Sequence, residues 1–342
     1  MKRLAILAVS IVFNGAALAD DGPGFTRFTL DVAHHDTPVE GAVWYPADAG
    51  GERLEVGENA VFVGVPARKD AVLSEARYPA VLLSHGLGGR VRTLAWLAAG
   101  LAERGAIVIG VNHPNSTTLD LDLRQAVDHW TRARDLQAAL DYLLEEPRWL
   151  ESVDQSRIMA AGFSFGGWTA LSMGGVTAHL AGFAAYCEEF VHQDSVCRDL
   201  ARADVDLRVL DVDRWDASYR DGRVAAVAAI DPWLHPGLQA SNVTDLVDNI
   251  LLIGLGSASE RNLTRVFGVP DSNPSILMSG VSKEIIVPAR HFTALLTCKP
   301  SGAAILKEEG DDPVCDDPQG TDRGAVHQRI VSLIAGQLGL DD

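Results

Sequence analysis

The stretch Gly162-Phe163-Ser164-Phe165-Gly166-Gly167 decides how the rest of the chain is interpreted. An apolar run, residues 157–161, precedes it, and a helix-compatible stretch, residues 168–173, follows. A strand, a Gly-x-Ser-x-Gly turn and a helix in this order are typical of a nucleophile elbow, in which a tight turn lifts the serine above a sheet edge. Because the two glycines of the motif lack a Cβ, the strand and helix backbones can approach closely. We expect Ser164 to be a nucleophile in a strained turn; the other interpretation is a glycine-rich turn with a solvated serine.

The N-terminus of the 342-residue chain predicts a secretory signal peptide, residues 1–19. It has a positive start, a short apolar run at 4–13 and the small-x-small sequence Ala17-Leu18-Ala19, so we expect an exported protein, periplasmic or secreted. The run is too short to span a bilayer, and no later stretch is long and apolar enough, so no stable membrane insertion is expected. Neither an internal repeat nor a low-complexity linker divides the remainder, which predicts one domain, residues 20–342, with insertions.

The balance of charge is strongly acidic. The net charge is −17, and it is −19 without the two cations of the signal peptide, Lys2 and Arg3. Such a surface repels phosphate backbones, so we expect no nucleic-acid partner.

The four cysteines form two local pairs in the sequence. An even count in an exported chain predicts disulfides, and pairing of nearest neighbours, Cys187 with Cys197 and Cys298 with Cys315, is favoured among the three possible connectivities. No C-x-x-C or paired Cys/His spacing supports a metal site.

The pattern of apolar runs predicts the order of the elements. Residues 25–30 and 40–45 indicate an antiparallel hairpin whose turn holds His34 and His35, which we expect to be solvated; residues 46–78 are expected to be irregular. Further elements are expected as strands at 79–84, 106–111, 157–161, 224–230, 250–255 and 284–287, and helices at 91–105, 123–146 and 325–338. This alternation predicts an α/β fold with a mostly parallel sheet covered by helices on both faces.

Two polar segments interrupt the alternation, and each holds one cysteine pair. The first, residues 186–223, follows the elbow helix and is either a lid over the site or a stapled surface loop. The second is residues 297–321. Ligands of parallel sheets bind beyond the carboxyl ends of the strands.

A serine nucleophile needs an imidazole base, which follows it in the chain in this architecture. Of the histidines after Ser164, His291 comes directly after the strand expected at 284–287, where a base must lie. His192 lies in the first insertion, His235 is too close to the acid candidate, and His327 lies in the closing helix, where it is packed or solvated.

The carboxylate that orients the base is predicted at the end of another strand. Asp231 follows the strand at 224–230 and can point along the top of the sheet toward His291. The next strand offers no carboxylate until Glu260 or Asp271, so Asp231 is favoured; otherwise it caps a turn.

Two backbone N–H groups are expected to stabilise the oxyanion. One is that of Phe165, and the other is that of Leu87 in the glycine-rich loop at 84–89. His85, in the same loop, precedes the nucleophile and is interpreted as structural, tying the loop down.

Four motifs together resemble one branch of a known superfamily. They are His85-Gly86-Leu87-Gly88, the elbow, Ala229-Ile230-Asp231-Pro232-Trp233-Leu234, and His291-Phe292. The set is similar to the platelet-activating-factor acetylhydrolases (group VII phospholipases A2) and the dienelactone-hydrolase-like α/β-hydrolases. The resemblance implies the α/β-hydrolase fold, a triad of Ser164, Asp231 and His291, and oxyanion donors at Leu87 and Phe165.

The sequence departs from that branch in three respects. The insertion at 186–223 widens the spacing between nucleophile and acid, long membrane-docking helices are not evident, and dienelactone hydrolases carry a cysteine where this chain has Ser164. The expected activity is therefore that of a serine carboxylesterase without cofactor or metal, acting on a small-molecule or lipid ester with a short acyl chain or an acetyl-phospholipid-like structure. The alternatives are a peptidase or amidase on the same triad and an inactive, hydrolase-like binding protein.

Overall fold

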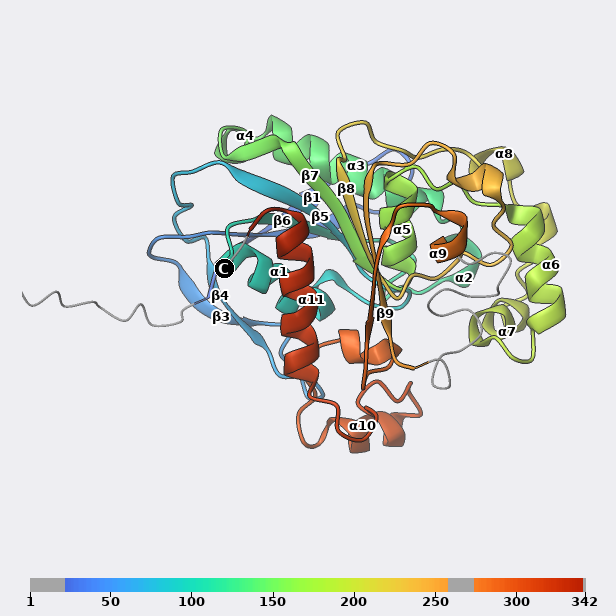
Figure 1. Ribbon diagram of the computed structural model, residues 1–342. Coiled ribbons are helices and arrows are strands. Elements are labelled where there is room, and N and C mark those ends of the chain that lie inside the picture. The colour runs from blue at the N-terminus through green and yellow to red at the C-terminus, as the bar shows by residue number, and fades with distance from the viewer. Residues whose placement is uncertain (1–21, 258–273, 341–342) are drawn as a thin grey trace, which may run out of the picture.

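A ten-stranded sheet forms the centre of the computed structural model, which describes residues 22–257 and 274–340 (Figure 1). The strand order is β10-β9-β8-β7-β5-β6-β2-β1-β4-β3. The strands are β1 (Gly24–Leu30), β2 (Val39–Tyr45), β3 (Glu52–Val56), β4 (Val65–Lys69), β5 (Tyr78–Ser84), β6 (Ile107–Asn112), β7 (Val153–Phe163), β8 (Ala226–Ile230), β9 (Asn249–Leu255) and β10 (Ser282–Ile286). The run from β6 to β10 is parallel, whereas β2 pairs antiparallel with both β6 and β1. The predicted mostly parallel sheet and its N-terminal hairpin are confirmed.

Helices cover both faces of the sheet, as predicted. One face packs against α1 (Ala95–Glu103) and α11 (Arg323–Gln337), and the other against α3 (Trp130–Glu145) and α5 (Phe165–Met173). The shorter helices are η1 (Val91–Leu94), α2 (Leu123–Ala126), α4 (Pro147–Leu150), α6 (Leu180–Phe190), α7 (Ser195–Arg202), η2 (Leu207–Val209), α8 (Val212–Trp215), η3 (Ala240–Val243), α9 (Pro274–Leu277), η5 (His291–Ala294) and α10 (Gly302–Glu309).

The central strands are apolar in the parts where both of their faces are covered. All residues of β8 are buried, as are the last six residues of β7 and of β9. Parallel strands buried on two sides carry continuous apolar runs rather than an alternating pattern. The polar residues that follow these strands therefore gather at one edge of the sheet, where the candidate site lies.

Two sequence predictions about elements are wrong. Residues 46–78 are not all irregular, since β3 and β4 form an antiparallel pair that extends the sheet beyond β1. Both strands are short and mix charged with apolar residues, which hid their alternation. The helix expected at 123–146 is broken into α2 and α3. His129 lies at the break, where its side chain donates to the Trp215 carbonyl (2.8 Å) and accepts from the Trp168 indole (3.1 Å).

Both disulfides join the pairs that the sequence favoured. Cys187–Cys197 links α6 to α7, and Cys298–Cys315 closes the segment around α10. Helices α6 to α8 lie together at one end of the molecule, beside α5, so the segment at 186–223, called the cap segment below, is largely helical (Figure 1).

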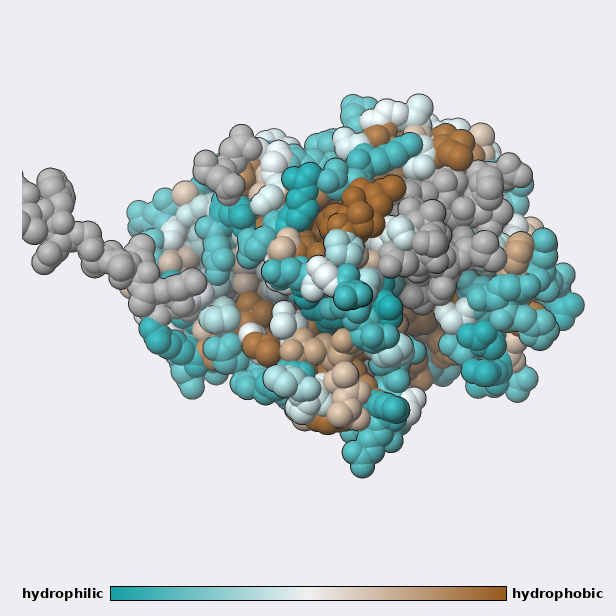
Figure 2. Space-filling view, turned by 60° about the horizontal axis from the view of Figure 1, so that its bottom comes forward, coloured by the Kyte–Doolittle hydropathy of each residue, from teal (hydrophilic) through white to brown (hydrophobic). Residues whose placement is uncertain are grey.

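The surface is largely hydrophilic on the face shown in Figure 2, with smaller hydrophobic patches between the charged side chains. Across the part of the chain that the structure describes, no helix combines the length and the apolar character needed to cross a membrane. The signal peptide expected at 1–19 lies outside the described residues.

Candidate active site

Ser164 lies in the tight turn between β7 and α5. Its backbone has φ +56° and ψ −118°, a conformation that a non-glycine residue adopts only when the surroundings hold it there. A Cβ on Gly162 would clash with the Gly166 carbonyl, and one on Gly166 would clash with that of Ser84. The two glycines are therefore required by close backbone approach, as the motif predicted.

The side chain of His291 connects the serine to a carboxylate. His291 begins η5, just beyond β10, and its Nε2 lies 3.0 Å from Ser164 Oγ. Its Nδ1 contacts Asp231 Oδ2 in a short hydrogen bond. With Nδ1–H donating to the carboxylate, the lone pair of Nε2 faces the serine hydroxyl, which is the arrangement a general base needs.

Asp231 is held where the sequence placed it, at the end of β8. It is 1% exposed and has φ +46°, and its backbone N–H donates to the Ile253 carbonyl of β9. Its Oδ1 lies 3.4 Å from the backbone nitrogen of Leu255. The rival acids Glu260 and Asp271 lie outside the described residues.

The loop after β5 packs directly on the serine. A Cβ built on Gly86 would lie 3.3 Å from Ser164 Cβ, so the backbone that leads to Leu87 runs beside Ser164. Within residues 22–257 and 274–340, neither Leu87 nor Phe165 donates its N–H to a backbone carbonyl. Phe165 is the first residue of α5, where N–H groups have no partner within the helix.

His85 ties this loop down, in agreement with its structural interpretation. Its Nδ1 donates to the Gly86 carbonyl (2.7 Å), and its Nε2 accepts from the backbone N–H of His113 (3.1 Å). Burial, with the Arg132 charge nearby, lowers the pKa of His85 well below its usual value, so the ring is neutral.

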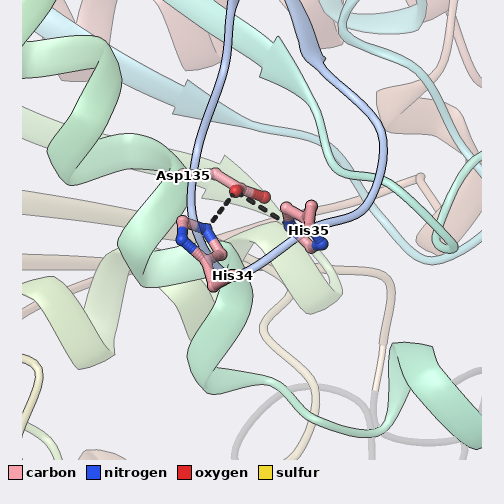
Figure 3. Close-up of side chains that lie close together, drawn as sticks. All are labelled: His34, His35 and Asp135. Atoms are coloured by element: carbon pink, nitrogen blue, oxygen red, sulfur yellow. Dashed lines mark hydrogen bonds and ion pairs between the residues drawn. The ribbon is translucent and has the colours of Figure 1, made fainter.

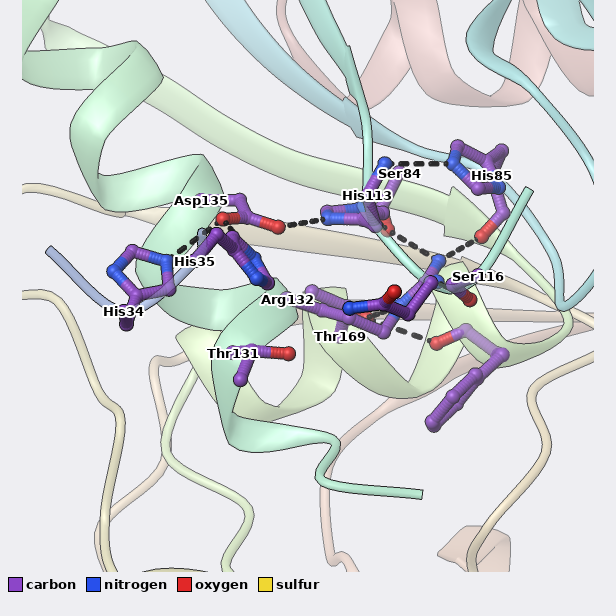
Figure 4. Close-up of polar contacts among 12 residues, drawn as sticks. His34, His35, Ser84, His85, His113, Ser116, Thr131, Arg132, Asp135 and Thr169 are labelled. Carbon is purple, nitrogen blue, oxygen red and sulfur yellow. Dashed lines mark hydrogen bonds and ion pairs between the residues drawn. The ribbon is translucent and has the colours of Figure 1, made fainter. Parts of the chain in front are cut away.

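A buried polar network beneath the loop escaped sequence reasoning (Figure 4). Arg132, on α3 and 1% exposed, donates to the His85 carbonyl, to Ser116 Oγ (2.5 Å) and to Thr169 Oγ1 (3.1 Å) on α5. It therefore joins the loop after β5 to the elbow helix. Its guanidinium also lies 4.6 Å from the ring centre of Phe165. The only signal in the sequence was a charged residue within an apolar helical stripe.

Asp135 supplies the counter-charge of this network. Burial alone would raise the pKa of Asp135, but hydrogen bonds from the surrounding imidazoles hold it well below the usual range. One of these imidazoles is that of His113, whose Nδ1 lies 2.8 Å from Asp135 Oδ2. The carboxylate is thus an anion that balances the buried guanidinium of Arg132.

Ser84, His113 and Asp135 form a second relay with the geometry of a triad. Ser84 Oγ lies 2.8 Å from His113 Nε2, on the far side of the ring from Asp135. All three side chains have no exposed surface, and Ser84 Oγ also accepts a hydrogen bond from Arg132 (3.2 Å). Burial lowers the pKa of His113 to about 4. A substrate carbonyl cannot reach this serine without unfolding the strand end around it.

The prediction that His34 and His35 are solvated is wrong. Their side chains are 18% and 5% exposed, and both Nε2 atoms lie close to the buried Asp135. The β1–β2 turn packs on α3, where its two histidines are partners for a buried carboxylate that the apolar pattern did not predict.

The other histidines that follow Ser164 lie outside the relay that Ser164 forms with His291. His192 is exposed in the turn between α6 and α7, and His235 is buried after β8. Of the two alternatives for His327, packed or solvated, the structure shows the first. His327 stacks on Trp96 (3.9 Å between ring centres) and donates to the Thr293 carbonyl (2.9 Å).

The disulfide-closed segment at 297–321 supports the loop that carries His291. Thr293, two residues after the base, donates from Oγ1 to Asp317 Oδ1 (2.7 Å). Asp317 in turn pairs with Arg323 at the start of α11 (2.9 Å). The position of the base thus depends on this second insertion.

Known proteins align with only part of the chain in sequence, whereas a solved structure superimposes on nearly all of it. No family model matches the sequence. Over 92 residues the chain is 36% identical to cutinase est2 of Thermobifida alba and to cutinase cut1 of Thermobifida fusca, covering 26% of this chain and 28% and 26% of those proteins. The chain thus aligns with about a quarter of the length of the curated relatives it matches.

A solved structure, a ferulic acid esterase from Streptomyces cinnamoneus, superimposes with a TM-score of 0.57 and 19% identity over 94% of this chain and 92% of that one. The fold is the α/β-hydrolase fold. At this identity the likeness establishes the architecture, which agrees with the expectation from the sequence.

Proposed function

We propose that this protein is a serine hydrolase that cleaves carboxylic esters through an acyl-enzyme. The observation that carries the proposal is the relay from Ser164 through His291 to Asp231, which spans three strand ends of the fold. The cutinases matched over part of the chain bear names of the same reaction class.

The reaction follows from the geometry. Ser164 Oγ attacks the ester carbonyl while His291 Nε2 takes its proton, and Asp231 stabilises the imidazolium that forms. The N–H groups of Leu87 and Phe165 would donate to the oxyanion. The imidazolium then gives its proton to the leaving alcohol, and a water molecule activated by the same base releases the acid and regenerates the serine.

Ser164 is favoured over the buried Ser84 because only Ser164 has both a strained elbow and exposed surface. The direct comparison is hydrolysis of p-nitrophenyl acetate by Ser164→Ala and Ser84→Ala. We expect the first to lower kcat by a factor of about 10³ or more, and the second to keep most of the activity of the folded enzyme. Loss with Ser84→Ala alone, at unchanged melting temperature, would reverse the assignment.

The substrate we propose is a small-molecule or lipid ester with an apolar acyl part. A row of aromatic rings leads from the elbow to the cap segment: Phe165 lies 5.2 Å from Trp233, and Trp233 lies 5.8 Å from Phe183 on α6. Trp233 also donates its backbone N–H to the Ser164 carbonyl, which fixes the row to the nucleophile. The three rings are buried, and we propose that they form an apolar wall behind the acyl site, which would suit apolar chains rather than charged ones.

The cap segment at 186–223 is proposed to act as a lid over this apolar wall. It contains a cavity of about 460 Å³ lined by Cys187, Leu200, Leu207 and their neighbours, and no residue of the relay lines it. The cavity is therefore assigned to the cap segment and not to the reaction.

Membership of the platelet-activating-factor acetylhydrolase and dienelactone-hydrolase-like branch remains a proposal that rests on the four sequence motifs. A series of p-nitrophenyl esters from acetate to palmitate, together with an acetylated phospholipid, tests it. Faster hydrolysis of the acetate than of the longer p-nitrophenyl esters, together with hydrolysis of the acetylated phospholipid, supports this branch. Preference for long acyl chains counts against it. The two disulfides favour an oxidising compartment, so we also propose export.

The alternatives predict different outcomes with matched substrates. A peptidase or amidase would turn over a p-nitroanilide at a rate comparable with that of the ester of the same acid. A binding protein on an inactive scaffold would hydrolyse neither and would not react with a fluorophosphonate.

A further inference from the structure

Two adjacent histidines of the β1–β2 turn converge on one oxygen atom of a helix residue (Figure 3). His34 Nε2 lies 2.8 Å from Asp135 Oδ1, and His35 Nε2 lies 3.0 Å from the same atom. The three ligand-type atoms all lie within 4.8 Å of one another. The turn and α3 are 100 residues apart in the chain, so this convergence is made by the fold.

Hydrogen bonding does not account for the whole cluster. His34 has a well-formed hydrogen bond to Asp135. His35 Nε2 is as close, but within the described residues it makes no hydrogen bond of acceptable geometry, although its side chain is only 5% exposed. A buried ring nitrogen that lies beside a carboxylate oxygen without an aligned N–H is placed as a metal ligand would be.

Both nitrogen–oxygen distances suit a divalent transition metal after small shifts. At the usual zinc–nitrogen and zinc–oxygen lengths, tetrahedral ligand atoms lie about 3.3 Å apart. The two nitrogen–oxygen distances of 2.8 and 3.0 Å would need to lengthen by only a few tenths of an ångström. His34, 18% exposed, lies at the surface edge of the cluster, on the side from which a cation and a water ligand would have to enter.

The surroundings of Asp135 are those of a supported ligand. Its other oxygen, Oδ2, is held by His113 Nδ1 at 2.8 Å, and His113 is fixed in turn by Ser84 (Figure 4). Ligating carboxylates are commonly oriented by such outer partners.

We propose that His34, His35 and Asp135 form a structural site for a divalent cation of the zinc class. Both imidazoles would bind through Nε2 in the Nδ1–H tautomer, with one carboxylate oxygen and water completing the coordination. The cation would pin the β1–β2 turn to α3 and thereby brace the network under the loop after β5. The site stands apart from the proposed ester hydrolysis, which needs no metal.

The test measures binding directly, without reference to activity. Protein freed of metal with a chelator is titrated with ZnCl₂ by calorimetry, and with CoCl₂ by absorbance between 500 and 700 nm. We expect one equivalent of Zn²⁺ per chain, a rise in melting temperature, and the intense visible bands of four-coordinate Co²⁺.

His34→Ala and His35→Ala should each weaken Zn²⁺ binding by a factor of ten or more and abolish the thermal shift. His192→Ala removes an exposed histidine elsewhere and should change neither. Because His34 is partly exposed, we expect His34→Ala to fold, and circular dichroism checks that it does. No binding by the wild type, or equal binding by all four proteins, overturns the proposal.

Discussion

Arg132 of α3 donates a hydrogen bond to the backbone carbonyl of His85, the residue that opens the loop after β5. The same guanidinium reaches Thr169 on the elbow helix, so a single buried cation connects the two segments proposed to supply the oxyanion donors. The geometry of these donors therefore depends on a side chain that never contacts the ester.

Replacing Arg132 by lysine keeps the charge but removes most of the four donor contacts. We expect kcat to fall by about tenfold or more with a smaller change in KM, because small misplacements of catalytic groups act mainly on the transition state. The measurement is steady-state hydrolysis of p-nitrophenyl acetate with a melting curve for each variant. Arg134→Lys, two residues along on the exposed side of α3, is the matched control and should behave as wild type.

Replacing Asp317 by asparagine weakens the support of the His291 loop. The pKa of Asp317, which burial alone would raise, is lowered by hydrogen bonds from Arg323 and Thr293, so the carboxylate form is the one that holds the loop. We expect Asp317→Asn to reduce both turnover and thermal stability by a measurable amount, whereas Glu309→Gln, an exposed residue of α10 in the same segment, should leave both nearly unchanged. Equal effects of the two variants would remove the assigned role of the segment at 297–321.

Acid should destabilise the protein through its buried imidazoles. Burial lowers the pKa of His113, His129 and His327 to about 4 from 6.5. Because the folded protein binds fewer protons than the unfolded chain below pH 6.5, stability is fully present above that pH and is lost as the pH falls toward 4. Each group contributes on the order of 3 kcal/mol to this loss.

Denaturant titrations at pH 7, 5.5 and 4.5 measure this dependence. The variant His327→Gln keeps a donor for the Thr293 carbonyl but cannot titrate, so its unfolding free energy should fall less steeply with acid. A wild-type free energy that stays constant over this range would contradict the assignment of neutral, buried rings.

The elbow glycines offer a steric test. Gly166→Ala would drive a methyl group into the Ser84 carbonyl, so we expect little folded protein. Gly336→Ala on α11 places the same methyl group in open space and should stabilise the helix by about 0.5 kcal/mol. Melting temperatures of the two variants, compared with wild type, should move in opposite directions.

The residues of the relay could be predicted from the sequence because each follows a strong local signal. Ser164 lies in a glycine-rich turn, and Asp231 and His291 come directly after apolar strands. In a parallel sheet such strand ends meet at one edge, so residues that are distant in the chain come together. The same rule placed the loop of Leu87 beside the serine.

The buried network was missed for the opposite reason. Arg132 and Asp135 lie within a helix whose periodicity indicates only which face is apolar, and His113 follows a buried strand. Whether a polar residue on such a face is buried depends on partners from other segments, here Ser84 and the β1–β2 turn. For that reason His34 and His35 were expected in solvent, and the break between α2 and α3 at His129 went unrecognised.

The measurement that tests the central claim most directly is covalent labelling by a fluorophosphonate, located by peptide mass spectrometry. We predict stoichiometric labelling of Ser164, with labelling lost in Ser164→Ala and strongly slowed in His291→Gln, while Ser84 stays unlabelled. Labelling at Ser84, or none at all in protein whose fold is intact, would contradict the central claim.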